Sequence, residues 1–241
     1  MISDSRGKGL LHLLKLNSPK FIIWDEIVLP GARLEFITKK IERASRRAKW
    51  DLIIVNAGIC NLTVRTKSRH GTTLNYKHSR LEETRQAIDI VLNTFGKCVQ
   101  VCTITPASLS KFAATFKSRA DDPAEVIDNE QERLNEDIRE LNSHITSRNI
   151  HRDLPTINLA ANSLTHKIKK QGKNRKRITK FCDKGLVDGV HPSEHLKTVW
   201  AKHIGVTISK IAQKIWTSSI ETNEESSSEE EPAESWNFKR Q

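Results

Sequence analysis

Two short polar blocks, near opposite ends of the chain, contain residue types that could take part in acyl-group chemistry. The first is Asp4-Ser5, which leads into an apolar helical stretch. The second is Asp188-Gly189-Val190-His191, in which an acidic residue precedes a histidine by three positions. At this spacing the carboxylate can hold one imidazole nitrogen while the other nitrogen faces outward as a general base. The second block is therefore a candidate for the orienting and base half of a serine triad.

Both blocks also have purely structural interpretations. A serine at a strand-to-helix turn is usually an N-cap, whose oxygen accepts a backbone N–H. In the second block, Asp188 could form an Asx-type turn with His191 on the surface, and Ser193 could cap the next helix. The residue types alone leave these interpretations open.

The segments between the two blocks alternate between strand-like and helix-like patterns. Short apolar runs, typical of buried strands, occupy 27–29, 52–55, 99–104 and 157–159. Apolar residues at helical spacing occupy 37–48, 80–95, 123–147 and 193–216. This alternation predicts right-handed βαβ units and an α/β fold with a doubly wound parallel sheet, whose active site lies at the carboxyl ends of the strands. The polar segments 63–78 and 166–180 are expected to be loops.

Composition and charge limit the domain organisation and the kind of partner that can be expected. The chain has 241 residues and a net charge of +11, which fits one domain over 1–216 followed by a disordered Ser/Glu-rich tail over 217–241. That tail carries seven Glu against Lys239 and Arg240, so the domain itself carries about +16. A body this basic favours anionic partners.

Several kinds of protein and of binding site are not expected. No apolar stretch is long enough for a membrane span and the start lacks the order of a signal peptide, so we expect a cytoplasmic or nuclear protein. The four cysteines form no CxxC pair and do not cluster with histidines. Neither a metal site nor a cofactor is predicted.

Taken together, four blocks in this order resemble the SGNH (GDSL-like) hydrolase superfamily over nearly all of 1–216, including the divergent esterase-like domains that some mobile elements encode. The blocks are Asp4-Ser5, Gly31 after the second strand, Gly58-Ile59-Cys60-Asn61 after the third, and Asp188-x-x-His191 before the last helix. The resemblance implies a three-layer, flavodoxin-like fold. It also implies Ser5 as nucleophile, His191 as base and Asp188 as its orienting carboxylate.

The resemblance further implies an oxyanion hole and a small ester or acyl substrate. The Ser5 and Gly31 backbone N–H groups would donate to the oxyanion, together with side chains at positions 60 and 61. Here Cys60 takes the place of the family's asparagine, and Asn61 takes the place of its aspartate. Because a thiol is a poor donor, this substitution is expected to cost about 10²–10³ in rate unless Asn61 shifts into the role.

The amino end departs from the family pattern as well. Only Met1 and Ile2 precede Ser3, whereas the family's first strand is central in the sheet. Either the reading frame is truncated or the sheet lacks a central strand. The second option leaves backbone groups unpaired in the core, so truncation of the first strand is the favoured interpretation.

A second functional hypothesis follows from the charge and from Cys60. The chain could be a catalytically impaired module of the same fold that binds nucleic acid through its basic surface. The segment 166–180 carries eight Lys and Arg between Lys167 and Lys180, and such a segment can contact phosphates. It could equally be a solvated loop or a nuclear-localisation-type segment.

Overall fold

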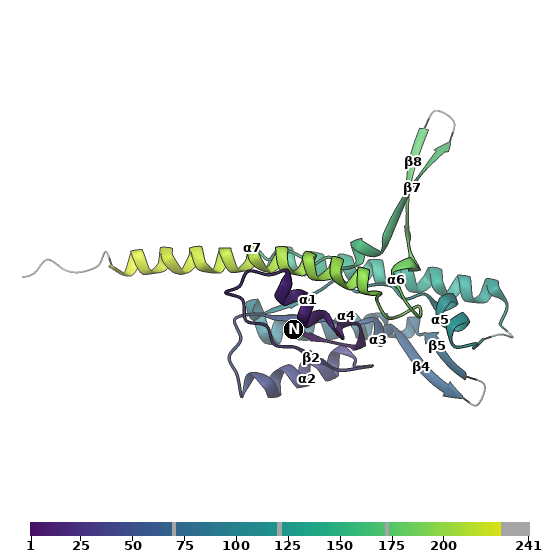
Figure 1. Cartoon of the computed structure of the whole chain (residues 1–241), viewed down its shortest axis with the longest axis horizontal. Helices are drawn as coiled ribbons and strands as arrows, with labels where there is room; N and C mark the ends of the chain where they lie inside the picture. The colour runs from purple at the N-terminus through teal and green to yellow at the C-terminus, as the bar shows by residue number, and fades with distance from the viewer. Residues whose placement is uncertain (69–70, 120–121, 172–173, 228–241) are drawn as a thin grey trace, which may run out of the picture.

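A four-stranded parallel sheet lies at the centre of the computed structural model, which describes residues 1–68, 71–119, 122–171 and 174–227 (Figure 1). The strands are β1 (Ile2–Ser3), β2 (Ile27–Val28), β3 (Ile53–Asn56) and β6 (Val99–Val101). Their order is β2-β1-β3-β6, and all neighbours are parallel. The chain therefore winds from β1 to β2 on one side and then to β3 on the other. In such sheets the crevice between the two directions of winding, at the carboxyl ends of β1 and β3, is where ligands bind.

Helices pack on both faces of the sheet, as expected for a three-layer α/β fold. One core joins Val55 of β3 with α2 (Leu34–Ser45), α4 (Leu81–Phe95) and α6 (Ala124–His151). The other core joins Ile54 with α1 (Leu10–Leu16) and α7 (Glu194–Ser227). Successive residues of a strand point to opposite faces, so the apolar run of β3 supplies both cores. The predicted doubly wound fold is confirmed.

The central strand β1 is present, although it has only two residues. Its neighbours pair with it on both sides, since Ile2 lies opposite Ile27 and Val55 in the two ladders. Met1 and Ser3 carbonyls accept from Ile27 and Leu29 N–H at 2.9 and 2.8 Å. The alternative that the sheet lacks a central strand is therefore wrong. Strand β2 is equally short, whereas β1 pairs with only Val55 and Asn56 of the four residues of β3. Truncation of the first strand stays a prediction.

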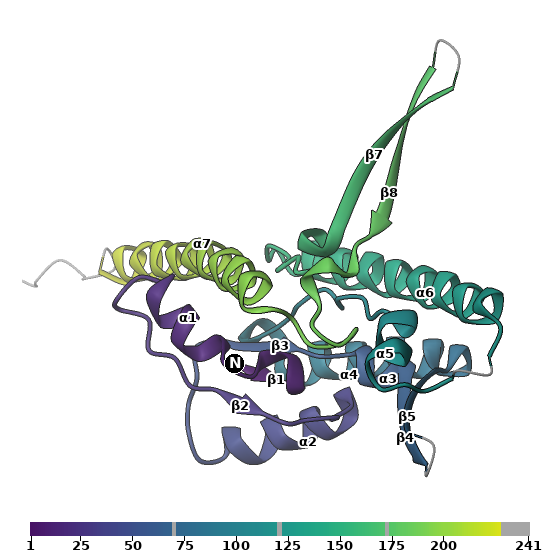
Figure 2. The same ribbon diagram turned by 45° about the vertical axis from the view of Figure 1, so that its right-hand side comes forward.

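Two segments expected to be loops are β-hairpins. Strands β4 (Thr63–Ser68) and β5 (Gly71–Tyr76) pair antiparallel, as do β7 (Leu164–Gln171) and β8 (Asn174–Phe181). Figure 1 and Figure 2 show the β7–β8 hairpin projecting from the body. A two-stranded ribbon in solvent needs no apolar face, so its polar sequence resembles a loop. The side chains of 165–180, which carry the predicted nucleic-acid contact, lie outside the described part, and that contact stays a prediction.

The remaining differences concern element ends. Residues 157–159, expected as a strand, join no sheet, although the Ile157 carbonyl accepts from Thr103 N–H at 3.0 Å. Helix α7 continues to Ser227, beyond the expected end at 216. Residues 228–241 lie outside the described residues, so the tail over 217–241 remains a prediction. Within the described residues, no helix combines the length and apolar character that crossing a membrane requires.

The other short elements connect these parts. They are α3 (Ile59–Leu62), α5 (Leu109–Thr115) and the 3-10 turns η1 (Ser5–Gly7), η2 (His78–Arg80), η3 (Gly96–Cys98), η4 (Ala160–Ser163) and η5 (Asp183–Gly185).

Candidate active site

Ser5 lies in the turn that follows β1, at the carboxyl edge of the sheet. The chain leaves β1 at Ser3 and enters η1 directly. The Asp4 side chain caps this turn, because its Oδ1 accepts from Arg6 N–H at 2.9 Å. The capping role that the sequence left open for Ser5 is thus filled by Asp4. The half-buried Ser5 hydroxyl can therefore bond to another group.

Asp188 and His191 lie in a tight turn between η5 and α7. Val187 N–H donates to the His191 carbonyl at 2.7 Å, which closes the turn across its base. Gly189 adopts φ +86° at its tip and packs against the loop after β6, where Ser108 N–H donates to its carbonyl at 2.7 Å. A Cβ at Gly189 would lie 2.5 Å from the Ser108 carbonyl oxygen. Only glycine fits this contact without a shift of backbone.

Asp188 serves the turn and the imidazole with different oxygens. Its Oδ1 accepts from Val190 N–H at 3.0 Å and from His191 N–H at 2.8 Å, which is the Asx-type turn. Its Oδ2 lies 2.7 Å from His191 Nδ1. The structural and the orienting interpretations of Asp188 thus hold together. Ser193 Oγ also accepts from Leu196 N–H at 3.3 Å and caps α7.

The charge state of Asp188 fixes which way these bonds point. Burial alone would raise its pKa, but the hydrogen bonds from His191 N–H, the His191 ring and Val190 N–H outweigh burial and lower the pKa. The carboxylate is therefore ionised at neutral pH and accepts hydrogen bonds only. A neutral His191 ring must then carry its proton on Nδ1, which leaves Nε2 as an acceptor.

His191 Nε2 lies 3.0 Å from Ser5 Oγ. Ser5, His191 and Asp188 thus form one continuous chain of hydrogen bonds, although they come from the two ends of the sequence. The His191 side chain is 38% exposed and that of Asp188 is 16% exposed. The His191 end of these hydrogen bonds is therefore more exposed to solvent, and the Asp188 end is more enclosed. Such an arrangement can take a proton from the serine hydroxyl while the carboxylate stabilises the resulting imidazolium.

Two backbone donors, the N–H groups of Ser5 and Gly31, have no protein partner among the described residues. Among the hydrogen bonds of the described residues, none uses the N–H of Ser5 or of Gly31. Gly31 is exposed, adopts φ +70°, and has nothing within 4 Å of the position of a Cβ. Both residues are therefore available to donate to an added group.

Cys60 lies beside the same turn, bound to a buried acid. Its Sγ is 3.8 Å from Asp4 Oδ2. Burial and the negative charge of Asp4 raise the pKa of the Cys60 thiol to about 12. The thiol stays protonated at neutral pH, and Asp4 accepts its hydrogen bond.

Asn61 is buried and is used at the start of α2. Its Oδ1 accepts from Leu34 N–H at 3.0 Å, and its Nδ2 lies 3.1 Å from both Glu35 carboxylate oxygens. Leu34 is the first residue of α2, whose N-cap residue Arg33 makes no side-chain cap. Asn61, which lies in α3, therefore supplies the capping acceptor for the first N–H of α2. Both the oxygen and the nitrogen of its side-chain amide are thus engaged in hydrogen bonds within the protein.

Sequence reasoning missed Arg6. Its guanidinium is fully enclosed, with 2% of the residue exposed, and donates to the Thr105 side chain, to the Thr105 carbonyl at 2.5 Å and to the Pro106 carbonyl at 3.1 Å. Arg6 thus ties the Ser5 turn to the loop that also holds Gly189 through Ser108. A buried arginine is rare, and nothing in the spacing of the motif indicates one.

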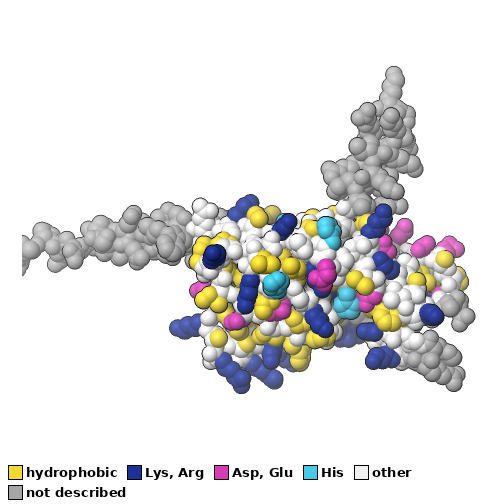
Figure 3. Space-filling model, viewed as in Figure 1, with side chains coloured by type: hydrophobic (Ala, Val, Ile, Leu, Met, Phe, Trp, Pro, Cys, Tyr) yellow, Lys and Arg dark blue, Asp and Glu magenta, His cyan; other side chains and the backbone are white. Residues whose placement is uncertain are grey.

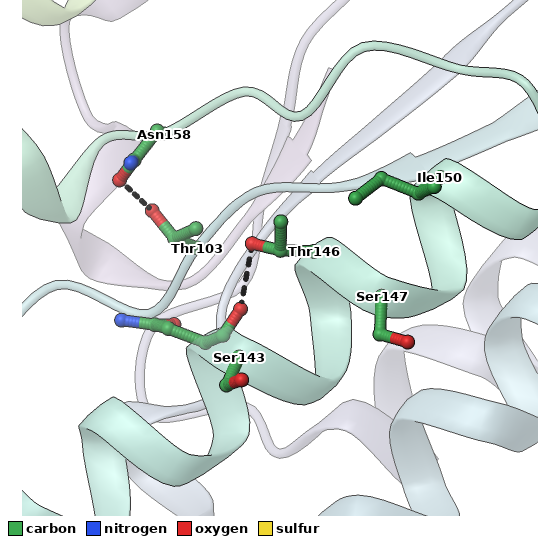
Figure 4. Close-up of a pocket in the computed structure, with 7 residues that line it drawn as sticks. Thr103, Ser143, Thr146, Ser147, Ile150 and Asn158 are labelled. Atoms are coloured by element: carbon green, nitrogen blue, oxygen red, sulfur yellow. Dashed lines mark hydrogen bonds between the residues drawn. The ribbon is translucent and has the colours of Figure 1, made fainter.

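An open hollow of about 410 Å³ lies elsewhere, between α6 and the segments after β6 and before η4 (Figure 4). Its lining is Thr103, Asn142, Ser143, Thr146, Ser147, Ile150 and Asn158. The figure shows Thr103 pointing to Asn158, to which its hydroxyl donates at 3.1 Å. None of the residues that bring Ser5 and His191 together lines this hollow, so it does not form part of the candidate site.

Comparison with solved structures identifies the fold. The chain is similar to a GDSL-like lipase from Bacteroides thetaiotaomicron, with a TM-score of 0.54, 14% identity and coverage of 89% of this chain and 86% of that one. It is also similar to the lipase/acylhydrolase from Enterococcus faecalis (TM-score 0.53, 18% identity, 86% and 94% covered). An acetyl xylan esterase matches with a TM-score of 0.51 and 12% identity, over 85% and 98%. No protein-family model and no curated protein matches the sequence. The likeness therefore rests on three-dimensional structure, and the fold of this chain is that of the SGNH, or GDSL-like, hydrolases.

Proposed function

We propose that the protein is a serine hydrolase that cleaves a carboxylic ester or a related acyl compound. The observation that carries the proposal is the hydrogen-bonded chain from Asp188 through His191 to Ser5. The names of the similar proteins, which include lipases and an acetyl xylan esterase, point to the same class of substrate.

In the first half of the reaction, Ser5 Oγ attacks the carbonyl carbon of the ester and His191 Nε2 takes the hydroxyl proton. The carbonyl π bond opens, and its oxygen becomes an oxyanion. Asp188 accepts from Nδ1–H throughout and stabilises the imidazolium. When the tetrahedral intermediate collapses, the ester C–O bond breaks and His191 returns its proton to the departing alcohol. Ser5 is left as an acyl ester.

In the second half, water replaces the alcohol. His191 takes a proton from the water as its oxygen attacks the acyl carbon, and a second tetrahedral intermediate forms. Its collapse breaks the bond to Ser5 Oγ, which recovers the proton from His191. The products are the carboxylic acid and the unchanged enzyme.

The oxyanion would be held by the N–H groups of Ser5 and Gly31, which have no partner in the described part of the chain. Cys60 adds little to this set, because its proton is directed to Asp4. Two donors in place of three predict a slow enzyme, since one oxyanion-hole donor is worth about 10²–10³ in rate.

The test is hydrolysis of p-nitrophenyl acetate and p-nitrophenyl butyrate by the purified chain. Wild type should turn over both esters, and Ser5→Ala and His191→Gln should fall to the rate of buffer alone. Ser79→Ala is the matched control, because Ser79 is an exposed serine in η2 and takes no part in the hydrogen bonds that join Asp188, His191 and Ser5. It should keep the wild-type rate. Equal rates for wild type and Ser5→Ala would reject the proposal.

A further inference from the structure

Six basic residues crowd one side of α2 and the turn that follows it. The segment from 39 to 49 contains one acidic residue, Glu42. Five of the six cations are exposed and one is half-buried. They are Lys39, Lys40, Arg43, Arg46, Arg47 and Lys49, here called the basic face. Dark blue side chains gather along the lower left edge of the molecule in Figure 3, in the region where Figure 1 draws α2.

The basic face follows from the amphipathic pattern of α2. Leu34, Ile37 and Ile41 are fully buried on the side that packs against the sheet. With 3.6 residues per turn, positions 36, 40, 43 and 47 form a row on the opposite side. The first of these is Phe36, which is 56% exposed. An aromatic ring thus lies at one end of a row of cations.

The cations of the basic face have no acidic partner in the part of the chain that the structure describes. Within the described residues, none of the six pairs with a carboxylate. Arginines around α6 behave differently, since Arg148 pairs with Asp89 at 2.9 Å and Arg119 with Glu130 at 2.7 Å. Uncompensated like charges repel one another, so this cluster is stabilised when an external polyanion covers it.

We propose that the basic face binds the phosphate backbone of a nucleic acid, with Phe36 against an unpaired base. From Phe36 to Arg43 the row covers seven residue steps of α2, about 10 Å at 1.5 Å each. That length corresponds to about three phosphates at 3.4 Å each along one strand. Aromatic side chains stack on bases next to such cations in proteins that bind single strands.

An anionic membrane is the less suitable partner. A helix that lies in a membrane buries its whole apolar side in the lipid, but the apolar side of α2 is already buried in the core. Phe36 is the one large apolar side chain that α2 exposes. A single ring among cations suits stacking better than insertion.

This binding is independent of ester hydrolysis and of the β7–β8 hairpin. Figure 1 and Figure 2 place α2 and the hairpin on opposite sides of the body. The two basic segments can therefore be tested separately. A hairpin variant, Lys169→Gln/Arg175→Gln/Arg177→Gln, removes as much charge as a triple variant of the basic face.

The experiment is fluorescence anisotropy with labelled 20-nucleotide single-stranded RNA, single-stranded DNA and duplex DNA, from 50 to 200 mM salt. In Lys40→Gln/Arg43→Gln/Arg47→Gln, affinity at low salt should fall about tenfold or more. The slope of log K against log salt should decrease by about 2 to 3. The control Lys77→Gln/Lys97→Gln/Lys202→Gln removes the same charge from exposed positions on other elements and should keep the wild-type slope.

Phe36→Ala separates stacking from charge. It should weaken single-strand binding about tenfold and leave the salt slope and duplex binding unchanged. The proposal is overturned if wild type binds no nucleic acid at 50 mM salt, or if the hairpin variant loses binding while the basic-face variant keeps it. It is also overturned if the chain binds phosphatidylserine vesicles but none of the three nucleic acids. Circular dichroism of each variant confirms that it is folded.

Discussion

His191 Nε2 lies 3.0 Å from Ser5 Oγ, although 186 positions separate the two residues in the chain. Each is held by its own local structure, Ser5 by the cap of Asp4 and His191 by the turn of Asp188. The two turns meet through the loop after β6, which Arg6 holds from one side. The contact thus depends on three segments, and changes outside the hydrogen-bonded chain should disturb it.

Replacing Asp188 by Asn should abolish most of the activity without unfolding the protein. The amide can still accept from the backbone of Val190 and His191 through its oxygen. Its Nδ2 would then face His191 Nδ1 as a donor and favour the opposite tautomer, in which Nε2 carries the proton. We expect kcat for p-nitrophenyl acetate to fall about 10³–10⁴-fold, with little change in KM. A loss of less than tenfold would show that Asp188 does not orient the base.

Gly189→Ala should damage both stability and activity. A Cβ there meets backbone atoms of Ser108 and Phe112 at 2.5 and 2.6 Å, at a φ of +86°. The strain and the forced backbone shift should cost about 2–5 kcal/mol, measured by urea unfolding. Displacing His191 by about 1 Å should also lower kcat about 10²-fold.

Gly96→Ala is the control for Gly189→Ala. Gly96 has φ +53° but nothing within 4 Å of a Cβ. Its ψ of −137° lies outside the left-handed helical region. The substitution should therefore show backbone strain alone, about 1–3 kcal/mol, and a wild-type kcat. Equal effects of the two substitutions on kcat would contradict the link between the Ser108 contact and the site.

Cys60→Asn should accelerate the reaction. An amide N–H is a stronger donor than the thiol, and a third oxyanion donor is worth about 10²–10³ in rate. We expect kcat to rise at least about tenfold if the amide reaches the oxyanion. Cys60→Ala, which removes the thiol without adding a donor, should stay near the wild-type rate. Identical rates for the two variants would mean that position 60 does not face the oxyanion.

Alkaline pH should reveal the burial of the Cys60 thiol. Its pKa is raised from an ordinary value near 9 to about 12. Between these values the unfolded chain has lost this proton and the folded protein still holds it, so stability falls as pH rises. The free energy of unfolding of wild type should fall more steeply than that of Cys60→Ala. The difference in slope should approach about 1.4 kcal/mol per pH unit above pH 9. Urea unfolding at pH 8, 9 and 10 measures it, and parallel curves would be the contrary result.

The layout of the fold could be predicted from periodicity and from apolar runs. Strand β3 and helix α4 lie where the sequence places them, because burial on both faces or on one face leaves a clear pattern. The two hairpins could not be predicted in this way. Each hairpin forms its own two-stranded sheet. In β5 a single residue, Leu74, is buried in the core, which leaves no periodic apolar pattern in the sequence.

The site was only partly predictable, for a different reason. The spacing of Asp188 and His191 suggested a base with its orienting carboxylate, and the family resemblance implied Ser5 as the nucleophile. Contacts that cross the fold are invisible in the sequence. Arg6 binds carbonyls 99 and 100 positions away, and Asn61 caps a helix that begins 27 residues earlier. Each of these roles depends on the packed arrangement and not on the residue type.

The most direct test of the central claim is covalent labelling of the folded chain by a fluorophosphonate at neutral pH. An activated serine displaces fluoride and forms a stable phosphonyl ester. Peptide mass spectrometry should locate the label on Ser5, and His191→Gln should suppress it, because the base that takes the hydroxyl proton is gone. Absence of label on Ser5 in wild type, or equal labelling in His191→Gln, would contradict the assignment of Ser5 and His191 as nucleophile and base.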